Sequence, residues 1–190
     1  MTVSCLFSGA KRAASLGIVM LAVVSCTTTP DTPLNCPQVA LVSDAMTITR
    51  FLPGRGQDLT DVDYTAELTD IESRCTFVSG RDENQTVVVA LAPAITAIRG
   101  PANVDRKANV DYLVSVTDQD QNILNLQRFS VSMDFVGNRN RASMTDNDPP
   151  VTVAIPLAAG TSPESYQIFV AFQLTPDELD YNRRTQDPRL

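Results

Sequence analysis

Carboxylates and cysteines are the side chains of this sequence considered first for chemistry, and the chain contains no histidine. Ser-His-Asp and Cys-His catalysis are therefore excluded, as are zinc sites with histidine ligands. A glycosidase needs two carboxylates across a cleft, and the candidates lie in two segments, Asp61 to Glu67 and Asp146 to Asp148. The first alternates with apolar residues, which indicates a strand surface, and the second precedes Pro149-Pro150, which indicates a turn. We therefore expect no enzyme, no cofactor and no metal site.

Cys26 follows a segment with the features of a secretory leader. The basic pair Lys11-Arg12 precedes a largely apolar run from Ala13 to Val24, which is shorter than the roughly 20 residues of a membrane-spanning helix. The ending Val23-Val24-Ser25-Cys26 resembles the lipobox of bacterial lipoproteins. This resemblance implies that residues 1–25 are a lipoprotein signal peptide and that Cys26 carries diacylglycerol. The alternative is a disulfide of Cys26 after an ordinary cleavage site.

The residue after Cys26 bears on the final location of the protein. In such lipoproteins, Thr27 in place of Asp implies delivery to the outer membrane, so we expect an anchored protein that faces the periplasm. Residues 26–35, polar with two prolines, are expected to form a lipidated flexible tether. Because an extended chain rises about 3.1 Å per residue, residues 27–35 reach only about 28 Å. The folded part would therefore lie close to the membrane.

Composition limits the domain count, the partners and the disulfides. Removal of residues 1–25 leaves 165 residues, so 36–190 are expected to form a single domain. Since the leader contains two of the 15 basic residues and none of the 22 acidic ones, the mature chain has a formal charge of −9, which argues against nucleic acid. With Cys5 removed and Cys26 lipidated, an oxidising compartment favours a disulfide between Cys36 and Cys75. Two separately buried thiols are the alternative.

Alternation of apolar and polar residues predicts that most of the chain is β-strand. The clearest runs are 62–69, 110–117, 128–135 and 166–172. Shorter strands are expected at 38–42, 46–52, 74–79 and 150–155, and a long apolar one at 86–98. Pro93 in this last run indicates a bulge, an edge or a bend. We therefore expect an all-β fold, an immunoglobulin-like antiparallel β-sandwich in preference to a barrel.

A short helical turn is expected near the C-terminus, where Thr175 can cap the segment Thr175 to Leu179. If the turn unwinds after Asp180, Leu179 and Tyr181 can pack across the end of the sandwich, with residues 182–184 in solvent. The segment is then either a structural lid or a docking peptide.

The C-terminal string YQIFVAFQLTPDELDYNR (166–183), together with Cys36-Pro37 and Cys75, is similar to alphaproteobacterial outer-membrane lipoproteins of unassigned function. This resemblance implies the envelope location and leaves the activity open.

Partner binding is the function that the remaining features favour. Arg139 and Arg141 are expected at a loop tip, where they either are solvated or meet lipid phosphate, lipopolysaccharide or an acidic partner loop. The candidate partner-binding residues are Arg139, Arg141, Leu179, Tyr181, Arg183 and Arg184. We hypothesise a non-enzymatic scaffolding module that binds another envelope protein through an exposed sheet edge or its tail.

Two further functions remain open. The first is a carrier or sensor of a small apolar or lipidic ligand between the sheets. A hollow lined by four aromatic residues would favour it: Phe129, Phe135, Tyr166 and Phe172. The second is a hydrolase built on carboxylates alone.

Overall fold

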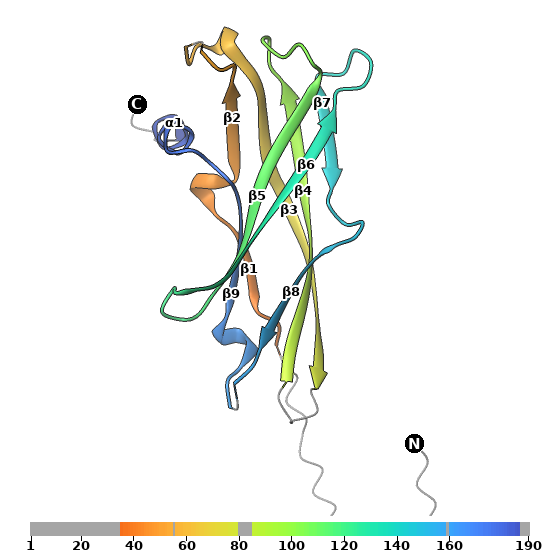
Figure 1. Ribbon diagram of the computed structural model, residues 1–190, viewed down its shortest axis with the longest axis vertical. Helices are drawn as coiled ribbons and strands as arrows, with labels where there is room; N and C mark the ends of the chain where they lie inside the picture. Colours follow the sequence, from red (N-terminus) through yellow and green to blue (C-terminus); the bar gives the residue numbers. More distant parts are fainter. Residues whose placement is uncertain (1–34, 55, 80–84, 159, 187–190) are drawn as a thin grey trace, which may run out of the picture. The chain divides into compact units, whose positions relative to one another are not determined.

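The computed structural model describes residues 35–54, 56–79, 85–158 and 160–186. The expected leader, Cys26 and the tether as far as residue 34 lie outside these ranges. Within them the chain forms a β-sandwich with one C-terminal helix (Figure 1), which confirms the predicted all-β fold class. None of the described helices is long and apolar enough to span a membrane.

The elements follow one another along the chain as β1 (Gln38–Leu41), η1 (Ser43–Ala45), β2 (Thr47–Phe51), η2 (Leu59–Asp61), β3 (Val62–Ser79), β4 (Gln85–Arg99), β5 (Lys107–Thr117), β6 (Ile123–Asp134), β7 (Arg141–Thr145), β8 (Val151–Pro156), η3 (Pro163–Ser165), β9 (Gln167–Phe172) and α1 (Pro176–Gln186).

The strands form two sheets. Sheet A has the order β1-β9-β5-β6, and sheet B has the order β2-β3-β4-β7, with β8 also paired to β4. Strands β1 and β9 pair in parallel, whereas the other pairs of described strands are antiparallel. Strand β4 is long enough to pair with β8 at 86–91 and with β7 at 94–98. Pro93, which has no N–H to donate, lies where β4 changes from one partner to the other.

The core lies between the two sheets because alternate residues of each strand point inward. In β5 the inward residues Val110, Tyr112, Val114 and Val116 are almost fully buried. The opposing face of sheet B contributes Leu68, Val87, Val89, Leu91 and Ile95. Burial of each such side chain stabilises the fold by about 1.5–3 kcal/mol relative to exposure.

A disulfide joins Cys36 to Cys75, which are 39 positions apart, and confirms the predicted bridge. Cys36 directly precedes the first strand of sheet A, and Cys75 lies in β3 of sheet B. The bridge therefore fastens the first described residues to the sandwich and links the two sheets.

Several element boundaries differ from those expected. The runs 62–69 and 74–79 form one continuous strand, β3, with a bulge between Leu68 and Asp70. Strand β7 was not predicted, because its sequence RASMT has only five residues and its alternation rests on Ala142 and Met144 alone. Arg141 is consequently the first residue of β7, while Arg139 lies in the turn before it. Asp61 ends the turn η2 and so does not share a strand face with Asp63 and Glu67.

Candidate functional site

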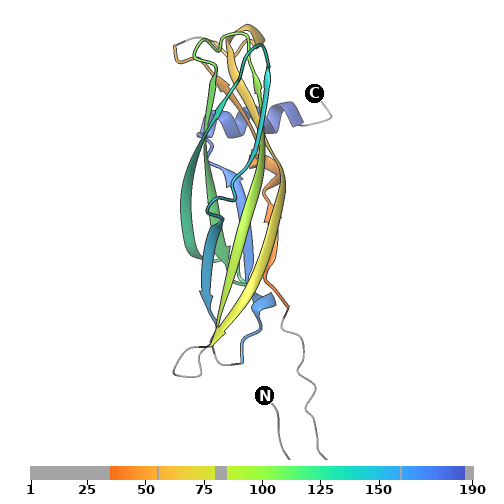
Figure 2. The ribbon, with the colours of Figure 1, turned by 90° about the vertical axis from the view of Figure 1, so that its right-hand side faces the viewer.

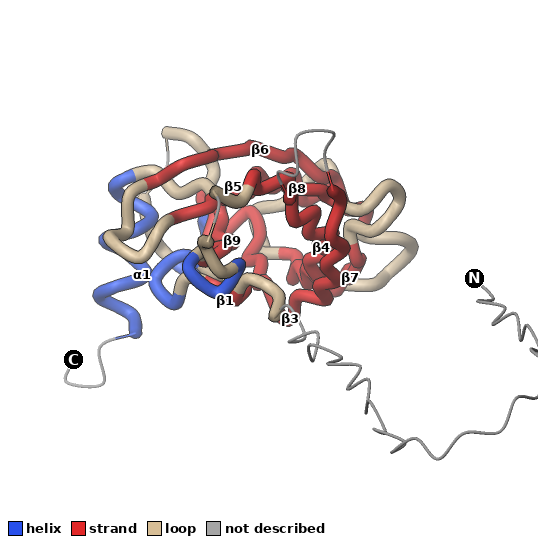
Figure 3. The backbone as a smooth tube through the Cα atoms, turned by 90° about the horizontal axis from the view of Figure 1, so that it is seen from below, coloured by secondary structure: helices blue, strands red, loops and turns tan. Residues whose placement is uncertain are grey.

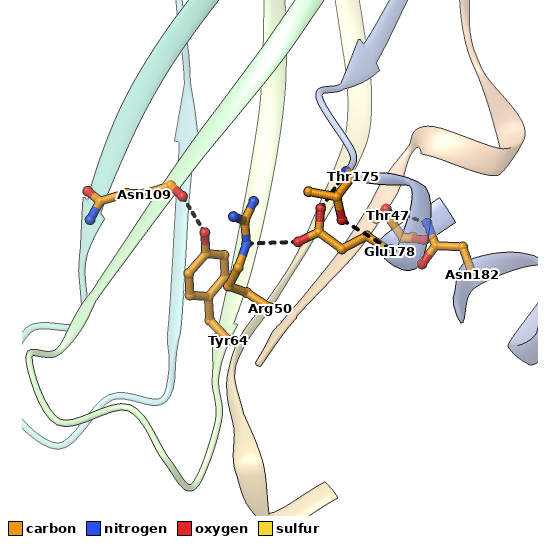
Figure 4. A network of polar contacts seen from close by, with 7 residues as sticks. All are labelled: Thr47, Arg50, Tyr64, Asn109, Thr175, Glu178 and Asn182. Atoms are coloured by element: carbon orange, nitrogen blue, oxygen red, sulfur yellow. Dashed lines mark hydrogen bonds and ion pairs between the residues drawn. The ribbon is translucent and has the colours of Figure 1, made fainter. Parts of the chain in front are cut away.

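The helix α1 packs on the domain beside β2, and a network of polar contacts joins the two (Figures 2 and 4). Its start carries a capping box. The N–H of Thr175 donates to Oε2 of Glu178 at 2.8 Å, and the N–H of Glu178 donates to Oγ1 of Thr175 at 3.3 Å. These bonds satisfy main-chain donors that a helix start leaves unpaired. The Thr-Pro-Asp-Glu sequence therefore sets where α1 begins.

Glu178 also connects α1 to β2. Its Oε1 lies 3.0 Å from Nε of Arg50, and the Glu178 side chain is only 13% exposed. A second contact follows one turn later, where the rings of Phe51 and Tyr181 meet edge to face with centroids 5.3 Å apart. An ion pair and an aromatic contact thus hold the helix against the same strand.

Asn182 makes the deepest contact of the helix. Its Nδ2 donates to the main-chain oxygens of Thr47 at 2.8 Å and Asp44 at 3.0 Å, and the residue is only 3% exposed. The prediction that Asn182 lies in solvent was therefore wrong. That prediction depended on the turn unwinding after Asp180, whereas α1 continues to Gln186, because the carbonyls of β2 and η1 give a buried amide its partners.

The predicted partner-binding residues of the tail are used within the domain. Arg183 forms an ion pair with Asp44 at 3.0 Å, and Nη2 of Arg184 lies 3.5 Å from Oε1 of Gln57. Tyr181 contacts Phe51, and Leu179 is half-buried. These contacts place the tail on its own domain as a lid over β2, while Arg139 and Arg141 are exposed.

Helix α1 covers the β2 edge of the sandwich, and most other edges have features that hinder the addition of a strand. Unpaired edge strands attract other strands, and proteins block them with short strands, charges, bulges, prolines or covering segments. Strands β1 and β7 are four and five residues long, and β8 ends at Pro156. The second half of β3 carries a bulge, a disulfide and three charged residues, Asp70, Glu72 and Arg74.

Strand β6 is the exception. It has 12 residues, lies at the margin of sheet A (Figure 3), and pairs only with β5 among the described strands. The N–H of Phe135 donates to the carbonyl of Arg106 at 2.9 Å, which shows that the odd-numbered residues of β6 face β5. The even-numbered residues from Leu126 to Asp134 therefore direct their main-chain N–H and C=O groups away from the sheet.

The side chains of β6 add apolar surface at its first end. Ile123, Leu124 and Leu126 are 64%, 54% and 47% exposed. Strand β6 contains no proline, and no described segment pairs with its outer edge. The sequence predicts a strand here but not its place in the sheet, because the order of strands depends on contacts between residues that are far apart in the chain. The outer edge of β6 is our candidate functional site.

The space between the sheets is a poor ligand site. A cavity of about 150 Å³ is lined by Val116, Leu124, Asn125, Ala154, Ile155, Pro156 and Tyr166. Small-molecule sites usually have volumes of roughly 300–1,000 Å³. Of the four aromatic residues expected around a hollow, only Tyr166 lines this cavity, and Phe135 and Phe172 pack in the core.

Two of the acidic residues considered for chemistry have hydrogen-bond partners, and a third is exposed. Asp63 accepts a hydrogen bond from Nδ2 of Asn103 at 2.7 Å, and Glu67 is exposed on the outer face of sheet B. Asp146 accepts one from the hydroxyl of Tyr112 at 2.5 Å. Burial and this bond raise the pKa of Tyr112. Within the described ranges, no three His, Cys, Asp or Glu residues are grouped closely enough to hold a metal ion.

Tyr64 connects the two sheets. It lies in β3, and its hydroxyl donates to the main-chain carbonyl of Asn109 in β5 (Figure 4). Burial raises the pKa of Tyr64 to about 12. The hydroxyl is therefore neutral at physiological pH and acts as a structural donor.

The chain matches no protein family model, no curated protein and no solved structure.

Proposed function

We propose that this protein is a non-enzymatic scaffolding module, lipid-anchored through Cys26 at the periplasmic face of the outer membrane. It binds another envelope protein that adds a strand to the outer edge of β6. The observation that carries the proposal is the row of even-numbered residues from Leu126 to Asp134, whose main-chain groups have no partner in the part of the chain that the structure describes. Strand addition uses such groups for affinity and the side chains between them for specificity.

The packing of the C-terminal tail on its own domain supports β6 as the binding site. Of the two routes by which the module could bind, an edge or the tail, the tail already packs on β2 through Asn182 and Tyr181. Release of α1 would expose a buried amide and break the two hydrogen bonds that it donates, which costs free energy. Binding at β6 requires no rearrangement of the domain.

The anchor is supported by the lipobox-like Val23-Val24-Ser25-Cys26 and by the position of Asn35. Asn35 precedes β1 in the chain, and β1 begins at the same end of the domain as the parallel strand β9, away from the β2–β3 and β4–β5 connections (Figure 1). Mass spectrometry of the mature protein tests the anchor. We expect an acylated N-terminal Cys26, and an unmodified thiol would contradict the proposed location.

A proline on the β6 edge tests the binding site. Ser130→Pro removes an N–H that points away from β5, and proline is tolerated at strand edges. Ser130→Ala is the matched control, because both variants lose the hydroxyl contact with Asp111 and only the first loses the N–H. With a photo-crosslinking residue at the exposed Leu124, we expect an envelope adduct in cells that Ser130→Pro abolishes and Ser130→Ala retains. An adduct of equal yield in both folded variants would overturn the proposal.

A further inference from the structure

We infer that the envelope protein that adds its strand to β6 is a second copy of this chain, paired through β6 in an antiparallel two-fold register with Val131 opposite Val131. This inference rests on the proposed strand addition at β6. A two-fold contact uses the same patch on both copies, so β6 must be complementary to itself.

The residues that face outward limit the possible registers. In an antiparallel pair, residues that direct their N–H and C=O groups toward the partner lie opposite one another. In a two-fold register, both strands pair about the same central residue. In only three such registers do at least four of the five even-numbered residues from Leu126 to Asp134 lie opposite one another. These registers are centred on Phe129, Ser130 and Val131.

Side-chain chemistry selects one of the three. The register centred on Phe129 places Leu126 opposite Ser132 and leaves Arg128 opposite a serine. The register centred on Ser130 places Leu126 opposite Asp134. Both oppose an apolar residue to a polar one and leave the single cation of the strand without an acid.

The register centred on Val131 places apolar residues opposite apolar ones, serine opposite serine, and the cation opposite an acid. Arg128 lies opposite Asp134 in both halves of the dimer, and Ser130 lies opposite Ser132. Leu126, 47% exposed, comes opposite Val136, 69% exposed, just beyond the end of β6. The chain remains extended through Phe135, which still bonds to Arg106, and Val136 begins the turn that follows, where its carbonyl accepts from the N–H of Arg139 at 3.2 Å.

Asp134 is accessible for this contact. It forms an ion pair with Lys107 at 3.0 Å, and its side chain is 66% exposed. Exposed ion pairs of this kind contribute little to stability, so an incoming guanidinium can share the carboxylate. Arg128 is exposed and has no ion-pair partner among the described residues.

The two-fold axis determines how such a dimer meets a membrane. In an antiparallel pair this axis runs perpendicular to the strands, so the two Asn35 residues lie at opposite ends of the dimer. Tethers that reach only about 28 Å would then hold the dimer lengthwise along the bilayer.

Cysteine crosslinking of the full mature protein in detergent tests the register. Residues directly opposite in a hydrogen-bonded pair have Cα atoms about 5.5 Å apart, which suits a disulfide. Differently tagged Ser130→Cys and Ser132→Cys proteins are mixed under mild oxidation. We expect mixed adducts at least tenfold above either homo-adduct. Preferential Ser130→Cys homo-adducts, or no adduct above that of a Ser143→Cys control on the outer face of sheet B, would overturn the inference.

Charge reversal tests, without introduced cysteines, whether the partner is a second copy of the chain. Arg128→Asp and Asp134→Arg each place like charges opposite one another twice, and we expect each to weaken dimerisation about tenfold or more in sedimentation experiments. The double variant R128D/D134R restores the pairs and should recover the wild-type dimer. Equal affinity in all four proteins would overturn the inference.

The two proposals fail in different ways. A monomeric protein whose cellular adduct contains a different polypeptide and is lost in Ser130→Pro would refute the second copy and leave strand addition at β6 intact. An adduct that Ser130→Pro does not affect would refute strand addition itself.

Discussion

The side-chain amide of Asn182 in α1 donates a hydrogen bond of 2.8 Å to the main-chain carbonyl of Thr47 in β2. Thr47 lies in β2, an edge strand of sheet B. A buried amide from a distant part of the sequence therefore covers part of the β2 edge of sheet B. No described segment pairs with the outer edge of β6, which leaves that edge accessible.

Asn182→Ala should lower the free energy of unfolding by about 2 kcal/mol. The substitution removes two hydrogen bonds and leaves the carbonyls of Asp44 and Thr47 without the amide donor. Urea unfolding followed by circular dichroism measures the change. Arg184→Ala is the control, because Arg184 makes only a 3.5 Å contact at the surface, and it should change stability by less than about 0.5 kcal/mol. Equal losses in both variants would contradict the assigned role of Asn182.

Removal of the Cys36–Cys75 bridge should destabilise the domain by roughly 4 kcal/mol on a chain-entropy argument, because the bridge spans 39 positions. The double variant C36S/C75S avoids an unpaired thiol and is compared with the wild type by urea unfolding. A reducing agent should lower wild-type stability to that of the variant and leave the variant unchanged. If reduction destabilises the variant to the same extent, the loss does not come from this bridge.

Much of the sandwich could be predicted from the sequence because period-two alternation is a local signal. In β5, for example, Val110, Tyr112 and Val114 alternate with polar residues and are all buried. The disulfide was predictable as well, since few cysteines remained to pair.

The long-range features could not be predicted in the same way. The burial of Asn182 depends on carbonyls some 135 positions earlier in the chain, and nothing within the tail signals them. The polar tail also lacks an apolar stripe that would extend the expected helical turn to Gln186. The open edge of β6 depends on the order of strands in sheet A, which alternation does not encode. The candidate site therefore emerged only from the strand order.

Stability should fall as pH rises from 10 to 12. The pKa of Tyr64 is raised to about 12 by burial, from an ordinary value of 10.0. Because the folded state holds this proton more tightly than the unfolded state, the stabilisation is complete below pH 10 and is lost as pH approaches the folded pKa. Urea unfolding at a series of pH values measures the slope. Tyr64→Phe should show a shallower slope, and an unchanged slope would contradict the role of this hydroxyl.

Gly100→Ala should be among the most damaging single substitutions in the domain. A Cβ at this position would lie 2.1 Å from the main-chain oxygen of Val62, and a main-chain atom cannot rotate away as a side chain can. Two hydrogen bonds fix the chain around Gly100 against β3. The N–H of Gly100 donates to Asp63 O at 2.7 Å, and that of Ala102 donates to Val62 O at 3.0 Å. We expect a loss of about 3 kcal/mol or more in the free energy of unfolding.

Gly56→Ala is the matched control for this prediction. A Cβ there meets Oδ2 of Asp61 at 3.6 Å, an ordinary van der Waals distance, so the substitution should change stability by less than about 1 kcal/mol. The two variants are compared by urea unfolding under the same conditions. If Gly100→Ala unfolds at the same urea concentration as Gly56→Ala, the β4–β5 connection does not pack against Val62 as closely as the structure shows. The hydrogen bonds of Gly100 and Ala102 to β3 would then have to be reconsidered as well.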